Sequence, residues 1–176
     1  MRRDKALLRW GDSTLLDHAL ARLREVCPDV RILCGPEPRY ADRGVPAHVD
    51  AVADAGALGG VYTGLLRTEW PYGLFLGVDI PFATVPLLRR LLELAAGHDA
   101  VVPVSRGGPE PLCAVYAKAC LEPIRRRMES DDFKMTCFWP DVRVREVGQE
   151  ELAAFGDVDR LFRNVNSPED YERSRA

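Results

Sequence analysis

Apolar residues recur along the chain in short runs that alternate with amphipathic stripes. After Ser13 and Thr14, aliphatic residues fall three or four positions apart, which predicts a helix that begins at these hydroxyl residues. The runs VRILC at 30–34 and AHVD at 47–50 each precede turn residues and are typical of short strands. A glycine-rich stretch then leads into a predicted helix at 59–70. The N-terminal part of the chain therefore alternates helices with strands.

The middle of the chain repeats this alternation with stronger signals. GLFLGVD at 73–79 is the clearest strand pattern, and we expect it in the centre of a sheet. A leucine stripe predicts a helix at 87–95, and DAVVPVS at 99–105 predicts a second buried strand. EPLCAVY at 110–116 follows turn residues as a further strand, and a helix is expected at 118–129.

The C-terminal part carries weaker patterns. A short helix is expected at 133–139, and the alternation of VRVREV at 142–147 predicts an edge or half-exposed strand. EELAAF at 150–155 is typical of a helix, and Ser167 before Pro168 is typical of a helix start.

This order of elements predicts an α/β fold of three layers, in which helices cover both faces of a mostly parallel, Rossmann-like sheet. A length of 176 residues is that of one domain, so we expect a single domain over residues 1–176. Hydrophobic residues at 47% and charged residues at 29% are ordinary for globular proteins. These values exclude a disordered or fibrous chain.

Charge and targeting signals narrow the class of protein. A net charge of -3 gives no basic field for a polyanion, so nucleic acid is not an expected partner. No apolar run is long enough to span a bilayer, and the N-terminus has no signal-peptide pattern. The odd number of five cysteines indicates a reducing compartment. We expect a cytoplasmic protein without a membrane partner.

Two carboxylates stand where strands are expected to end. Ligands of doubly wound sheets bind beyond the carboxyl ends of the strands. Asp79 follows the clearest strand, and a carboxylate there is a suitable ligand for Mg²⁺ or, alternatively, a cap for the next turn. Asp50 occupies the same place after the run AHVD, where a solvated turn aspartate is the alternative. Both are candidate site residues.

Other candidates are less specific. GALGGVYTGL at 56–65 lets a backbone approach a ligand closely, but it matches neither common phosphate-loop pattern, and a plain turn is the alternative. Lys5 lies in a charged terminal segment. Asn164 and Asn166 flank Val165, so both amides point to one side of an extended segment, although asparagines also form turns. The histidines have no nucleophilic partner in a recognisable setting, so a nucleophile–base mechanism lacks support.

Five segments, taken in order, resemble the molybdenum cofactor guanylyltransferases across nearly the whole chain: RRDKALLRWGDSTLLDHAL, DAVADAGALGGVYTGL, LFLGVDIPF, EPLCAVY and NVNSPEDY. That family begins with a strand, a glycine-rich LAGG loop and an R-M-G-x-D-K segment. Here the chain starts within that segment, with Arg2 where the family usually has glycine. We therefore expect these residues to lack the family's first strand and most of its phosphate loop, and to bind nucleotide weakly.

The resemblance implies roles for single residues. Lys5 matches the family lysine that contacts nucleotide phosphates, Asp50 an aspartate near the guanine and ribose, and Asp79 the magnesium ligand. Asn164 and Asn166 match a pair close to the reacting centre. The segment beside the nucleotide, GPLAG in the family, corresponds to Gly56, Ala57, Leu58, Gly59 and Gly60. The usual proline is alanine here, and the usual alanine is Gly59.

The implied reaction is transfer of GMP from MgGTP to the terminal phosphate of molybdenum-bound molybdopterin, with release of pyrophosphate. Mg²⁺ is then the cofactor, GTP and molybdenum-molybdopterin are substrates, and molybdoenzyme maturation proteins are further partners. Such chemistry needs positioning and charge neutralisation more than a protein nucleophile. One alternative is a related nucleotidyltransferase that uses CTP or acts on a sugar or alcohol phosphate. The other is a noncatalytic nucleotide-binding or assembly protein.

Overall fold

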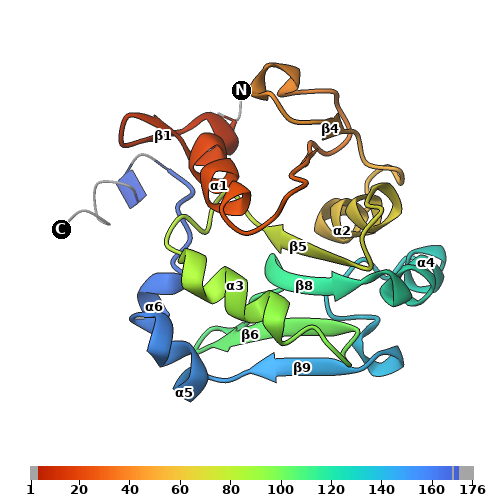
Figure 1. Cartoon of the computed structure of the whole chain (residues 1–176). Coiled ribbons are helices and arrows are strands. Elements are labelled where there is room, and N and C mark those ends of the chain that lie inside the picture. Colours follow the sequence, from red (N-terminus) through yellow and green to blue (C-terminus); the bar gives the residue numbers. More distant parts are fainter. Residues whose placement is uncertain (1–3, 168, 171–176) are drawn as a thin grey trace.

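The computed structural model describes residues 4–167, 169 and 170. Its main sheet has five strands, and helices pack on both faces, so the predicted α/β class is confirmed (Figure 1). The strands of this sheet are β5 (Tyr72–Leu76), β6 (Ala100–Ser105), β7 (Gly108–Pro109), β8 (Cys113–Ala117) and β9 (Val144–Val147). The helices are α1 (Leu15–Arg24), α2 (Gly56–Arg67), α3 (Val85–Glu93), α4 (Leu121–Glu129), α5 (Gln149–Leu152) and α6 (Val158–Leu161).

Alternate residues of the central strands build two separate cores. On β8, Cys113 and Val115 face α3, α5 and α6, while Ala114 and Tyr116 face α2 and α4. All four side chains are buried, as expected for strands that are covered on both faces. The sheet is therefore the middle of three layers.

The sheet is mixed rather than mostly parallel. β9 pairs with β6 in parallel, but β8 runs antiparallel to both β5 and β6. The cause lies in the connection, because the chain returns from β6 through the short hairpin with β7, and no crossover helix separates β6 from β8. The predicted parallel direction holds for β5, β6 and β9.

Two further strands form a small parallel sheet of their own. They are β3 (Ile32–Leu33) and β4 (Ala47–His48), and among the described residues they do not pair with β5. The strand expected in the centre therefore lies at the edge of the five-stranded sheet. All residues of β5 are only partly buried.

Several element bounds differ from the sequence predictions. Helix α2 begins at Gly56 and not at position 59, because the glycine-rich stretch is itself helical. Residues 133–139 form no α-helix, and only a 3₁₀ turn follows at Trp139–Asp141. The pattern also missed the hairpin of β1 (Arg9–Trp10) and β2 (Ser13–Thr14), whose strands are too short for a periodic signal. The helix start expected at Pro168 falls on a residue outside those described.

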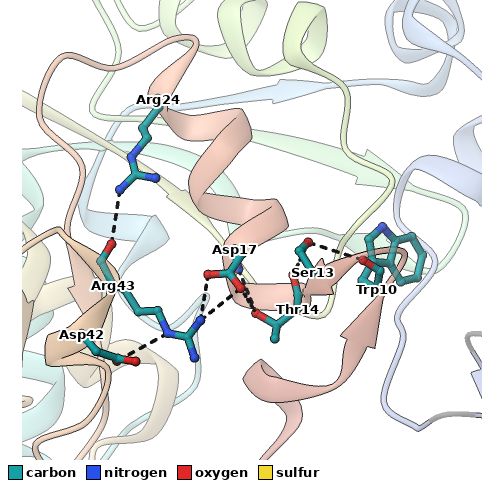
Figure 2. Close-up of polar contacts among 7 residues, drawn as sticks. All are labelled: Trp10, Ser13, Thr14, Asp17, Arg24, Asp42 and Arg43. Carbon is teal, nitrogen blue, oxygen red and sulfur yellow. Dashed lines mark hydrogen bonds and ion pairs between the residues drawn. The ribbon is translucent and has the colours of Figure 1, made fainter.

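Polar contacts at the start of α1 attach the small sheet to the rest of the fold (Figure 2). Thr14 caps the helix, since its Oγ1 accepts from the Asp17 amide at 3.2 Å and donates to Asp17 Oδ2 at 2.7 Å. Arg43, which follows β3, donates to the same carboxylate at 3.0 and 3.1 Å. The Thr14 hydrogen bond and the Arg43 charge hold the pKa of Asp17 below its usual range.

Candidate functional site

Residues from both ends of the described chain meet where β5 ends. The Val165 amide donates to the Asp79 carbonyl oxygen over 2.9 Å. The Lys5 ammonium donates to Oδ1 of Asn166. Lys5, Asp79 and the segment that holds Asn164 and Asn166 therefore form one cluster.

The carboxylate of Asp79 is not paired with any described residue. A Cβ added at Gly77 would lie 2.8 Å from Asp79 Oδ1, so the Asp79 side chain folds back towards the backbone at the end of β5. No described residue donates a hydrogen bond to the carboxylate. Among the described residues, no group of three His, Cys, Asp or Glu residues is placed to hold a metal. The donor set thus fits Mg²⁺ held by one carboxylate together with phosphate and water oxygens.

Lys5 is positioned by its neighbour Asp4. The Asp4 side chain caps the short 3₁₀ helix Lys5–Leu7 and accepts from the Tyr40 hydroxyl at 2.7 Å. Burial and this hydrogen bond raise the pKa of Tyr40 to about 12, so the hydroxyl keeps its proton. A hollow of about 400 Å³ opens here, lined by Asp4, Lys5, Ala6, Leu16, Ile32, Leu33, Cys34, Arg39, Tyr40 and Val78.

Asp50 lies between the end of β4 and the start of α2. Its amide donates to the Gly35 carbonyl oxygen at 2.9 Å, and its Oδ2 is 3.8 Å from where a Gly59 Cβ would lie. Its Oδ1 is buried and has no partner among the described residues. Burial raises the pKa of Asp50. A buried carboxylate oxygen that has no hydrogen-bond donor beside it is suited to accept a hydrogen bond from a ligand.

The glycine-rich turn of α2 supplies backbone rather than side chains. Gly56 has φ of +56°, which a residue with a Cβ rarely adopts. The side chain of Leu58 is fully buried in the core, so only its backbone is available to a nucleotide. Ala55 provides no side-chain cap, and the first amides of α2 therefore point towards whatever lies at its N-terminus.

The cluster also contains a carboxylate that the sequence analysis missed. Glu110, at the start of the segment EPLCAVY, accepts a hydrogen bond from Ser105 at 2.7 Å. Burial raises the pKa of Glu110, and the negative charge of Asp79 raises it further, while the Ser105 hydrogen bond opposes both. The only sequence signal was an acidic residue between a turn and a strand, which does not separate it from ordinary surface glutamates.

The family profile of the MobA-like NTP transferase domain matches residues 1–138, and the chain belongs to this family. The protein is therefore an enzyme of the nucleotidyltransferase class. A probable molybdenum cofactor guanylyltransferase of Pelotomaculum thermopropionicum is 33% identical over 175 residues, which are 99% of this chain and 85% of that protein.

Solved structures share the fold. Molybdopterin-guanine dinucleotide biosynthesis protein A from Archaeoglobus fulgidus superposes with a TM-score of 0.79 at 22% identity, over 97% of this chain and 88% of that one. The 2-C-methyl-D-erythritol 4-phosphate cytidylyltransferase from Thermus thermophilus gives 0.71 at 19% identity, over 97% and 91%. The fold is thus common to enzymes named for different nucleotides. None of the described helices combines the length and the apolar character that a membrane crossing needs.

Proposed function

We propose that this protein transfers GMP from MgGTP to the terminal phosphate of molybdenum-bound molybdopterin. The observation that carries the proposal is the contact between Lys5 and Asn166 beside the free carboxylate of Asp79. It gathers the residues that the resemblance assigns to phosphate, acceptor and metal. The name of the Pelotomaculum thermopropionicum relative supports the same substrates.

In this reaction the acceptor phosphate attacks the α-phosphorus of GTP. A new P–O bond forms, the bond between the α- and β-phosphates breaks, and pyrophosphate leaves with the electron pair. Lys5 offsets the negative charge that grows on the leaving group, and Asn164 and Asn166 orient the acceptor. No base is required, because a phosphate is already anionic near neutral pH.

Asp79 holds Mg²⁺ in this proposal. When bound, Mg²⁺ would neutralise charge on the triphosphate and so lower the barrier to attack by the acceptor phosphate. Asp79 is suited to this because its carboxylate is partly exposed and has no partner among residues 4–167, 169 and 170. Glu110 lies close enough for its pKa to respond to Asp79, so it adds negative charge to the same place when it is ionised.

Asp50 and the start of α2 are proposed to select guanine. Oδ1 of Asp50 is buried and has no partner among the described residues, so it can accept a hydrogen bond. Guanine presents two adjacent donors to a carboxylate, N1–H and its amino group, whereas adenine and cytosine each present one donor beside an acceptor. Calorimetry with GTP, CTP and ATP tests this, on a form in which the first strand and LAGG loop of a relative are fused before Met1. Tightest binding of GTP supports the proposal, and equal or tighter binding of CTP replaces it with the cytidylyl alternative.

The noncatalytic alternative is tested by the same titration combined with an assay for pyrophosphate. If a fused form, in which the first strand and LAGG loop of a relative precede Met1, binds GTP but forms no product with any NTP and acceptor, the protein is a nucleotide-binding protein only.

We further propose that residues 1–176 act as one nucleotidyltransferase domain, whose GTP affinity rises when the backbone amides of a LAGG loop are added to it. GTP affinity of this chain should be compared with that of a fused form, in which the first strand and LAGG loop of a relative precede Met1. Much tighter binding by the fused form is expected, and indistinguishable dissociation constants would show that the site is placed wrongly.

A further inference from the structure

Arg160 of α6 is an exposed arginine whose guanidinium pairs with no carboxylate of the described residues. The two acidic side chains of its own turn have other partners. Asp157 caps α6 by accepting from the Arg160 amide at 2.8 Å, and Asp159 pairs with Arg106 at 3.1 Å. The guanidinium lies instead over the ring of Phe82, with Cζ 5.4 Å from the ring centroid. A ring face attracts the cation but accepts none of its N–H donors in the plane, so these donors can bind an anion.

Phe82 is held in place by two contacts with the N-terminal part of the chain. The rings of Trp10 and Phe82 pack edge to face, with centroids 5.2 Å apart and planes at 76°. His18 Nε2 lies 3.0 Å from the carbonyl oxygen of Pro81, the residue before Phe82. The ring of Phe82 is also partly buried. It therefore gives the Arg160 guanidinium a fixed support.

The contact between Arg160 and Phe82 lies beside the candidate site. Phe82 comes three residues after Asp79, which corresponds to at most about 11 Å of chain. Arg160 comes four residues before Asn164, and the amide of Val165 donates to the Asp79 carbonyl oxygen at 2.9 Å. The loop after β5 and the segment after α6 thus meet twice, once at the candidate site and once at the Arg160 guanidinium.

The charge of the acceptor phosphate needs a cation of its own. An acceptor phosphate must approach the triphosphate, and the two anions repel each other. Lys5 offsets charge on the leaving pyrophosphate in the proposed reaction, whereas Asn164 and Asn166 orient the acceptor and carry no charge. A cation on the acceptor side of the site would lower the repulsion. Arg160 is a cation next to the segment that carries both asparagines.

We propose that Arg160, held over Phe82, binds the phosphate of the acceptor and so holds this phosphate near GTP. A guanidinium presents parallel N–H donors that match two phosphate oxygens, and it stays charged at every physiological pH. Phe82 is a positioning residue, because it acts through Arg160. The identity of the acceptor rests on the proposed function, whereas binding of a phosphate monoester at Arg160 does not require transfer of GMP.

A binding experiment tests the phosphate site without nucleotide. The probe is 6-hydroxymethylpterin phosphate, which is titrated into the 176-residue protein and followed by its fluorescence. Arg160→Gln should weaken binding of the probe by about tenfold or more, because it removes charged hydrogen bonds. Arg126→Gln is the matched control, since Arg126 is an exposed arginine of α4 on the opposite face of the sheet, and it should bind the probe as the wild type does. The same pterin without phosphate should bind equally to the wild type and to Arg160→Gln.

Kinetics of the fused form separate the acceptor from the nucleotide. Arg160→Gln should raise the KM for molybdenum-molybdopterin by about tenfold, with kcat and the dissociation constant of GTP unchanged. Phe82→Leu should raise the same KM, and Phe82→Tyr, which keeps the ring face, should restore the wild-type value. The double variant Arg160→Gln, Phe82→Leu should have the KM of Arg160→Gln alone. A KM that rises by the product of the two single effects would contradict the positioning role of Phe82.

Three results would overturn the phosphate site. The first is a wild-type protein that does not bind the pterin phosphate, or an Arg160→Gln variant that binds it equally well. The second is an equal loss of affinity for the pterin without phosphate, which would assign Arg160 to the ring system of the acceptor. The third is weaker GTP binding by Arg160→Gln, which would assign Arg160 to the triphosphate. A protein that binds the pterin phosphate through Arg160 but transfers no GMP would support the phosphate site and refute only the proposed function.

Discussion

Lys5 and Asn166 are 161 positions apart in the chain, and the Lys5 ammonium donates to the Asn166 side-chain oxygen. This contact ties the first described helix turn to the segment after α6. If both side chains serve one reacting centre, their contributions to the rate will depend on each other.

A double-mutant cycle of Lys5→Met and Asn166→Ala in the fused form measures this dependence. Each single variant should lower the rate of GMP transfer by about 100-fold, since Lys5 offsets developing charge and Asn166 orients the acceptor. The double variant should lose a much smaller factor in the rate of GMP transfer than the product of the two single-variant factors. Fully multiplicative losses would mean that the two side chains act independently and that the contact has no role in transfer.

Asp79→Asn should reduce transfer by about 100-fold or more, because an amide is a weaker ligand for a divalent cation than a carboxylate. Binding of Mn²⁺, followed by electron paramagnetic resonance, should weaken in parallel. Asp131→Asn is the matched control, since Asp131 lies at the end of α4 and outside the cluster. Near-normal activity of Asp79→Asn at saturating Mg²⁺ would refute the assignment.

Two adjacent glycines of α2 should respond in opposite ways to alanine. A Cβ on Gly59 would lie 2.8 Å from Ala55 Cβ and 3.4 Å from the Val52 carbonyl oxygen, whereas a Cβ on Gly60 meets nothing within 4 Å. Gly59→Ala should lower the free energy of unfolding by about 1–3 kcal/mol. Gly60→Ala should leave it unchanged or raise it by up to about 1 kcal/mol, since alanine favours the helix. Urea unfolding of both variants measures these free energies. Equal changes in the two variants would contradict the close packing at Gly59.

The cap of α1 predicts a pH dependence of stability. The pKa of Asp17 is lowered in the folded protein, so its ionised form contributes stability that is complete above the unfolded pKa of about 4. This contribution is lost as the pH falls through the lower, folded pKa. Asp17→Asn should therefore destabilise the protein at pH 7, and its deficit in free energy of unfolding should shrink towards pH 3. Asp12→Asn, at an exposed site, controls for the loss of a carboxyl. A deficit that stays constant with pH would contradict the prediction.

Local patterns predicted the elements that pack against the centre of the fold. The leucine stripe of α3 and the apolar run of β6 were predicted correctly, because burial of one face or of both leaves a direct periodic signal. The direction of β8 was not predictable in this way. It depends on a short hairpin with β7, and periodicity carries no information about which strand a segment pairs with.

The candidate site depended on the resemblance more than on spacing. Asp79 was recognisable as a carboxylate at a strand end, but the approach of Lys5 to Asn166 depends on folding of the whole chain. Glu110 was missed for the same reason, since only the fold places it near Asp79. The open edge of β5 was also unexpected, because its sequence has the apolar character of a central strand.

In the most direct measurement, the fused form is incubated with Mg²⁺, molybdenum-molybdopterin and either GTP or CTP. Pyrophosphate release and the mass of the product are then followed. The account predicts that GTP yields a product heavier by one GMP, with one pyrophosphate for each product formed, and that CTP reacts far more slowly. An adduct that forms at an equal or higher rate from CTP, or no adduct from either nucleotide, would contradict it.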